Sequence, residues 1–148
     1  MFYGAQLCNL FAKDMEDLDV SYRSVLKRIW KVPLRTHTKI INNIGRVMPV
    51  HLLLYKRFTH FFYSCLHSTN PVINYLFHMS FYSRSRVGSN IKHIAAFLGL
   101  SFKEVWGMTS KFVCKLVKKH WDESNSEESI RIGEQVRELI ICLSLIHI

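Results

Sequence analysis

The sequence predicts an all-α protein of about five to seven helices in an irregular bundle. Three observations support this fold class. Apolar residues recur at every third or fourth position over long stretches, which is the spacing of one helix face. No segment shows the sustained apolar–polar alternation, bounded by hairpin turns, that is typical of a sheet. Six glycines and three prolines in 148 residues are too few for a β-sandwich with many turns.

The first helix is expected to begin near Asp14 and to end before Pro33, because proline pushes the residue before it out of helical geometry. Acidic residues occupy its first turn and basic residues its last, as the helix dipole favours. The apolar stripe expected to pack inward consists of Met15, Leu18, Tyr22, Val25, Leu26 and Ile29. Arg23, Lys27 and Lys31 fall opposite this stripe, so the helix should have a basic back.

The middle of the chain is expected to hold two longer helices. A short apolar piece over 40–44 precedes a helix that opens at Pro49, since proline is favoured in a first turn. Asn70 and Pro71 indicate an N-cap followed by a first-turn proline, so another helix should start there. The apolar stripe of that helix consists of Val72, Tyr75, Leu76 and Met79. Residues 83–89 are polar and basic and are expected to form a loop.

Two further helices are expected after this loop. The first covers 90–98 and is stopped by Gly99, because glycine readily adopts the left-handed conformation that ends helices. Ser101 and Glu104 have the spacing of a capping box, in which each side chain bonds the other residue's free amide. The helix that they start should continue to Trp121.

The last part of the chain is expected to form an acidic, serine-rich linker over 122–129 and a terminal helix over 130–143. Residues 143–148 end the chain abruptly on an apolar run, and we assign them no function. The predicted regions are a basic helix region over 1–45, a helical region over 46–121, and the linker with its terminal helix over 122–148.

Charge is strongly segregated along the sequence. The net charge is +9, and the pI is near 9.6. Residues 21–120 carry +16 and contain Glu104 as their single acid, whereas residues 1–20 carry −3 and residues 121–148 carry −4. A hundred residues at +16 repel one another unless something anionic lies against them. The charge therefore favours a polyanionic partner.

Catalytic and metal chemistry have little support in the sequence. The basic hundred residues hold one carboxylate, Glu104, whereas a two-metal nucleotidyl-transfer site needs several. Eight histidines are scattered without an H-x-x-x-H or H-E-x-x-H pattern, and Cys65 and His67 would face different sides of a helix. Phosphate-binding glycine loops are also missing. We expect no catalytic residue, no metal and no cofactor.

Secretion and membrane insertion are not indicated either. The four cysteines have no C-x-x-C spacing, which argues against a zinc finger and a disulfide framework. The longest apolar run, 139–148, is about half the length that a membrane span needs. The first residues lack the charged and apolar regions of a signal peptide. We expect an intracellular protein, cytoplasmic or nuclear, with no membrane partner.

The strongest candidate site is a run of cations on and after the first helix, spaced every three or four residues. Its members are Arg23, Lys27, Arg28, Lys31, Arg35 and Lys39. Such a surface binds a phosphate backbone without sequence preference and in a salt-sensitive way. Trp30 and His37 lie between these cations and offer rings on which bases can stack.

An alternative hypothesis is a helix-turn-helix DNA-binding protein that uses residues 90–112. The apolar spacing from Ile94 to Met108, with Gly99 at the turn, matches that motif, and the recognition helix would cover 102–112. A plain αα-hairpin has the same spacing, so the pattern leaves both open. A third hypothesis is a basic helical module that binds acidic proteins or an anionic membrane surface.

Several stretches resemble non-LTR retrotransposon reverse transcriptases of the LINE or jockey type. Residues 3–10 are similar to that family's Tyr-Gly-x-x-x-Trp segment, with Cys8 in the place of the tryptophan. Residues 20–37 resemble its Arg/Lys-rich helix, which ends in a Leu-Pro-x-Arg-Thr-His-like stretch that fits residues 32–37. The stretches similar to the downstream part of such reading frames are 67–73 and 88–91.

This resemblance covers most of residues 1–120 and implies that residues 1–45 are the thumb, a helical element that packs against the primer–template duplex. The remainder would be the helical region after the thumb. The family's catalytic Asp pair belongs to the palm and has no counterpart in this sequence, and neither does its endonuclease. The chain would then be a fragment of an RNA-directed DNA polymerase, inactive by itself. Its partners would be the RNA or DNA template–primer and the palm domain of the parent polymerase.

Overall fold

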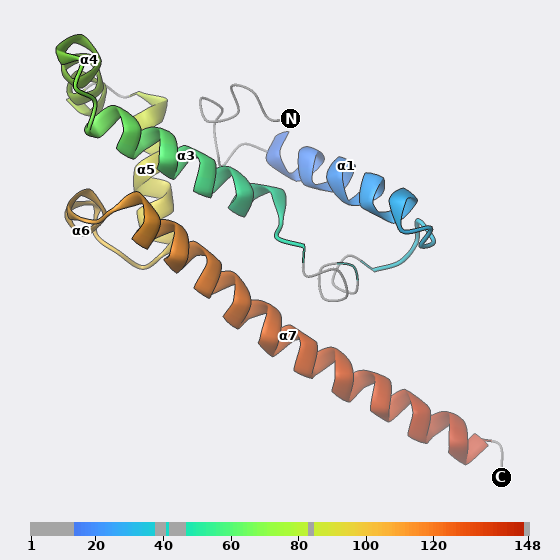
Figure 1. Ribbon diagram of the computed structural model, residues 1–148. Helices are drawn as coiled ribbons and strands as arrows, with labels where there is room; N and C mark the ends of the chain where they lie inside the picture. The colour runs from blue at the N-terminus through green and yellow to red at the C-terminus, as the bar shows by residue number, and fades with distance from the viewer. Residues whose placement is uncertain (1–13, 38–40, 42–46, 83–84, 147–148) are drawn as a thin grey trace.

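The computed structural model describes residues 14–37, 41, 47–82 and 85–146. Those residues form six helices and no strand, so the all-α prediction is confirmed (Figure 1). The helices are α1 (Asp14–Ile29), α3 (Val50–Leu66), α4 (Pro71–Tyr82), α5 (Arg86–Phe97), α6 (Phe102–Gly107) and α7 (Ser110–Ile146). Of the short apolar piece expected over 40–44, Ile41 is described, and it is helical and 2% exposed. The motif over 3–10 and Lys39 lie outside the described residues.

Helix α3 is the centre of the bundle. It contacts α1, α4, α5 and α7, and α1 and α7 lie on opposite sides of it (Figure 1). Phe58 and Phe62 of this helix are fully buried. The Phe62 ring lies 5.1 Å from Phe77 of α4 and 5.9 Å from Trp106 of α6, centroid to centroid. The apolar side chains of α3 therefore form the centre of the core.

Only the first half of α1 packs against this core. Met15 is buried and Tyr22 is partly buried, as expected. Val25 is 53% exposed and Ile29 is 67% exposed, so the prediction that they pack inward is wrong. The reason is geometric: α1 runs past the amino-terminal end of α3, and its last turns have none of the described helices against them (Figure 1).

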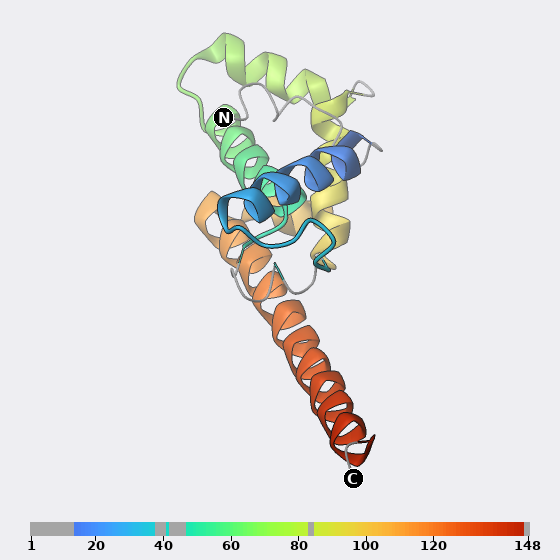
Figure 2. The ribbon, with the colours of Figure 1, turned by 90° about the vertical axis from the view of Figure 1, so that its right-hand side faces the viewer.

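Helix α4 lies across one end of the bundle (Figure 2). Its predicted start is confirmed, because the Val72 N–H donates to Asn70 Oδ1 at 2.9 Å. The apolar stripe predicted for α4 does not pack into the core, however. Phe77, which is not part of that stripe, packs into the core instead, with 6% of its surface exposed. The exposed members of the stripe are Val72, Tyr75, Leu76 and Met79.

Two helix boundaries in the structure differ from the predicted ones. Part of the loop expected over 83–89 is helical, because Ser85 accepts the Gly88 N–H at 3.2 Å and caps α5, which begins at Arg86. The helix expected from Phe102 to Trp121 is interrupted: α6 ends at Gly107, and Met108 is extended. Both predicted local signals between these helices are present. Gly99 has a φ of 66°, and Ser101 and Glu104 form the capping box.

The prediction of a linker over 122–129 is wrong, because α7 continues through these residues without a break. No glycine or proline lies between residues 108 and 132. Lys119 pairs with Glu123 at 3.6 Å across one turn of this segment. At 37 residues α7 is about 55 Å long. Its second half extends away from the bundle (Figures 1 and 2).

Among the helices described, none has both the length and the apolar character needed to cross a membrane.

Candidate nucleic-acid interface

Arg23, the first of the six predicted backbone-binding cations, has a structural partner. Its guanidinium lies 2.6 Å from Asp19 Oδ2, and both side chains are mostly shielded, at 22% and 15% exposure. The other oxygen, Asp19 Oδ1, accepts the Val50 N–H at 2.9 Å and so caps the start of α3. Pro49 provides no side-chain cap there, so Asp19 supplies one from another helix. Asp19 therefore joins α1 to α3, and Arg23, which is paired with Asp19, is not a free cation.

Lys27 is the second predicted cation with a structural partner. Its ammonium donates to the Leu34 carbonyl at 2.7 Å. The Thr36 N–H donates to the Pro33 carbonyl at 2.9 Å, which closes a turn in the same loop. The loop after α1 is thereby folded back onto the helix that precedes it.

The end of α1 is closed by a Schellman motif. The Val32 N–H donates to the Lys27 carbonyl at 2.9 Å, and the Lys31 N–H donates to the Arg28 carbonyl at 3.2 Å. Lys31 occupies the left-handed position of this motif with a φ of 55°. Glycine usually fills that position, because a side chain there costs about 1–2 kcal/mol. A strained lysine therefore stands where the backbone favours glycine.

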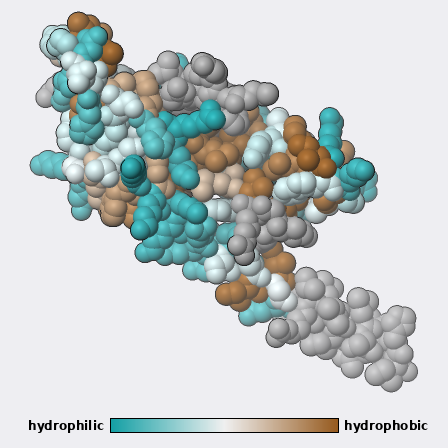
Figure 3. Space-filling model, viewed as in Figure 1, coloured by the Kyte–Doolittle hydropathy of each residue, from teal (hydrophilic) through white to brown (hydrophobic). Residues whose placement is uncertain are grey.

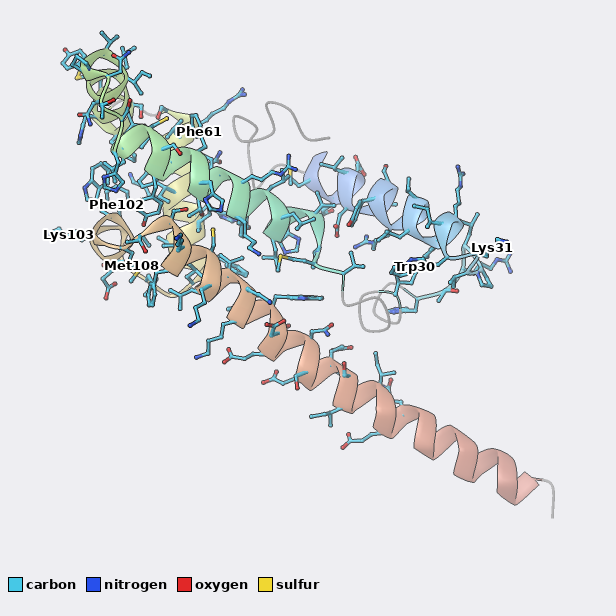
Figure 4. The ribbon with its side chains drawn as sticks, in the orientation of Figure 1. Trp30, Lys31, Phe61, Phe102, Lys103 and Met108 are labelled. Atoms are coloured by element: carbon cyan, nitrogen blue, oxygen red, sulfur yellow. The ribbon has the colours of Figure 1, made fainter. Side chains whose placement is uncertain are left out.

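The remaining described cations of the predicted run lie together at this end of α1. Arg28, Lys31 and Arg35 are exposed, and Trp30 is 38% exposed beside them. We call these four residues the α1 tip. Figure 4 shows Trp30 and Lys31 at the same end of α1, far from the α6 residues. Three cations around an aromatic ring can bind phosphates and offer a stacking surface.

A second basic surface was missed by sequence reasoning. Lys111, Lys115 and Lys118 are exposed on the first turns of α7, and we call them the α7 lysine row. Val113 and Val117 on the other side of the helix are fully buried. Figure 3 shows a hydrophilic surface over these turns. The sequence does contain a signal for this surface, because lysines recur at i, i+4 and i+7 and no acidic residue lies between residues 105 and 121.

Residues 102–112 do not form the continuous recognition helix that the helix-turn-helix alternative requires. Helix α6 has six residues, ends at Gly107, and is followed by an extended Met108. The expected helix over 102–112 is therefore two pieces with a break between them. A recognition helix must present several side chains along one major groove, which a six-residue helix does poorly. Helices α5 and α6 pack together, as the helices of either an αα-hairpin or a helix-turn-helix do.

Among the described histidine and cysteine side chains, His60 and Cys114 lie at the contact between α3 and α7. His60 of α3 bridges to α7, with Ser110 Oγ 2.8 Å from its Nδ1 and Cys114 Sγ 3.6 Å from its Nε2. Burial raises the pKa of the Cys114 thiol, outweighing the opposing effects of Lys56 and Ser110, so the nucleophilic thiolate is disfavoured. Within the described residues, no three His, Cys, Asp or Glu side chains gather as a metal site would need.

Two more histidines lie between α3 and α5. Tyr55 Oη and His93 Nε2 are 2.7 Å apart, and the His51 ring lies 5.8 Å from the Tyr55 ring. Burial lowers the pKa of both His51 and His93; for His51, Arg23 and His93 add to this effect and Asp19 opposes it. Both histidines are therefore neutral near pH 7 and add nothing to the basic surfaces.

Comparisons of the chain with protein-family models, with curated proteins and with solved structures find no match.

Proposed function

We propose that this chain binds the phosphate backbone of nucleic acid without sequence preference, as the thumb and post-thumb segment of a LINE-type reverse transcriptase would. The observation that carries the proposal is the left-handed Lys31 at the α1 tip. Backbone strain held at an exposed position points to a functional demand on the side chain. For a lysine flanked by Arg28 and Arg35, that demand is positive charge.

The charge around the α1 tip supports a polyanionic ligand. Asp19 and Glu104 are the nearest acids on either side in the sequence, so residues 20–103 contain none. Asp19 is itself occupied by Arg23 and by the start of α3. Nothing in the local sequence therefore neutralises the tip, whose cations gain most from a ligand with closely spaced negative charges.

The resemblance to reverse transcriptases gives this surface a specific role. The stretch over 32–37, which fits the family's Leu-Pro-x-Arg-Thr-His-like segment, is the loop that Lys27 folds back onto α1. In a thumb, such a loop would lie near the template–primer duplex. The proposed role is to hold that duplex, while the aspartate pair for polymerisation would come from the palm domain.

A charge-matched comparison tests the proposal. The R28Q/R35Q variant removes two cations of the α1 tip, and the R86Q/K92Q variant removes two exposed cations from α5. Binding of a fluorescent DNA duplex and an RNA–DNA hybrid is measured by anisotropy between 50 and 300 mM salt. The tip variant should flatten the slope of log K against log salt by about 2, since each lost phosphate contact removes about 0.9.

Equal slopes for the two variants would overturn the proposal. Anionic vesicles of phosphatidylserine and phosphatidylcholine provide the other arm of the test, because Ile29 and Leu34 beside the tip are 67% and 60% exposed. Sedimentation with the vesicles, without duplex binding, would assign the surface to a membrane instead.

A further inference from the structure

We infer that the α7 lysine row is a second backbone-binding surface, separate from the α1 tip. This inference rests on the proposed function, because it names a further contact with the same class of ligand. Lys111, Lys115 and Lys118 follow one side of α7 at spacings of four and three residues. Such spacings place side chains on neighbouring turns of one helix face.

The row stands on a rigid support. Val113 and Val117 are fully buried and Cys114 is 8% exposed, so this part of α7 is anchored against the bundle through its opposite face. The Cys114 thiol also lies 3.8 Å from the Lys56 carbonyl of α3. A helix held in this way presents its three ammonium groups over about 10 Å of helix rise. Closely spaced phosphates along a duplex can meet such a row without any base being read.

Like charges at these spacings destabilise a helix, so the row has a cost when no ligand is bound. Lys119, the residue after the row and four residues after Lys115, pairs with Glu123 at 3.6 Å. Lys111 and Lys115 have no acid at i+3 or i+4, whereas Lys118 has Asp122 at i+4.

The acids that follow define where the surface ends. Asp122, Glu123 and Glu127 are exposed on the next two turns. They would repel a phosphate backbone, so the expected footprint stops near Lys119. An acidic protein is a poorer fit to the row, because the centres of protein interfaces are depleted of lysine and rich in aromatic residues.

Three variants test the inference. The row variant is K111Q/K115Q/K118Q, and its control is R86Q/K92Q/K103Q, which removes the same charge from exposed positions on α5 and α6. The third is R28Q/R35Q at the α1 tip. All substituted residues are exposed, and circular dichroism checks that the helices remain. Affinity for a 20-base-pair DNA duplex is measured by anisotropy between 50 and 300 mM salt.

The row variant should bind about tenfold or more weakly than the scattered control at 150 mM salt. Its log–log salt slope should be flatter than the wild-type slope by about 2.7. A row variant that matches the scattered control, while R28Q/R35Q still loses affinity, would overturn the row and leave the proposed function standing. A wild-type chain that does not bind the duplex would overturn both.

Discussion

Replacing Lys31 with glycine should make the protein more stable and its binding to nucleic acid weaker. The left-handed conformation of Lys31, with φ of 55°, costs about 1–2 kcal/mol with a side chain present. Glycine removes that cost but adds about 0.4–1 kcal/mol of backbone entropy to the unfolded chain. The net gain should be about 0.5–1 kcal/mol, or about 2 °C in the melting temperature of a chain of this length.

The same substitution removes one cation from the α1 tip. Loss of one phosphate contact lowers the slope of log K against log salt by about 0.9, which corresponds to about fivefold in affinity at 0.15 M salt. Urea denaturation gives the stability, and anisotropy with a DNA duplex gives the affinity. K31A is the matched control, because alanine loses the charge and keeps the backbone strain. It should bind as weakly as K31G without becoming more stable.

Two results would refute this reasoning. A K31G protein that is less stable than the wild type would show that the lysine is not strained where it stands. Unchanged affinity in both K31G and K31A would show that the strain does not serve binding at the α1 tip.

Two other predictions concern stability. The D19A variant removes the cap of α3 and should lower the free energy of unfolding by about 1–2 kcal/mol. The R23Q variant keeps the bond between Asp19 Oδ1 and the Val50 N–H, so it should lower the free energy of unfolding by about 1 kcal/mol or less. Urea denaturation measures both losses, and a larger loss in R23Q than in D19A would contradict the capping role of Asp19. R23Q should also leave duplex affinity within twofold of wild type. Burial lowers the folded-state pKa of His51 and His93 below the usual value near 6.5, so the unfolded chain binds more protons below that pH. Their contribution to stability should be complete above about pH 7, fall as the pH drops through 6.5, and be lost below the folded-state pKa. Denaturation between pH 7.5 and 5 should show this decline, and an equally steep decline in a doubly substituted His51→Gln, His93→Gln protein would assign it to other groups.

The sequence was informative where a single residue determines the local backbone. Asn70 caps α4, Gly99 adopts positive φ after α5, and Ser101 with Glu104 forms the capping box of α6. Each of these signals acts within three or four residues. They need no knowledge of what packs against the helix, so the residue pattern alone predicts them.

Features that depend on tertiary packing were not predictable in this way. Val25 and Ile29 continue the apolar stripe of Met15 and Tyr22, but α3 covers only the first half of α1. The stripe of α4 is likewise amphipathic in sequence and exposed in the structure. Helical periodicity identifies which residues share a face, and it does not establish that another element covers that face.

The linker prediction over 122–129 failed for a different reason. Acidic and serine-rich segments are often loops, but without glycine or proline nothing in this one ends a helix that has already begun at Ser110. Adding one residue to an existing helix is far easier than starting a new one. One exposed ion pair, Lys119 with Glu123 at 3.6 Å, spans the boundary between the basic and acidic segments of this helix.

The candidate site was only partly visible in the sequence. The spacing of cations identified Arg28, Lys31 and Arg35, which are exposed in the structure. It also included Arg23 and Lys27. Asp19 lies four residues before Arg23 on the same helix, a spacing at which such side chains pair, whereas the Leu34 carbonyl is placed by the loop after α1. The α7 lysine row carries the same kind of signal. It became apparent as a surface only when the buried side of α7 was known.

The salt dependence of duplex binding by the intact chain tests the central claim most directly. The α1 tip and the α7 lysine row together offer six cations to phosphates. Log K should therefore fall linearly with log salt, at a slope of about −2.7 if a duplex contacts one surface and about −5 if it contacts both, with equal affinities for unrelated duplex sequences. A slope shallower than about −1, or a preference for one duplex sequence that survives high salt, would contradict the account.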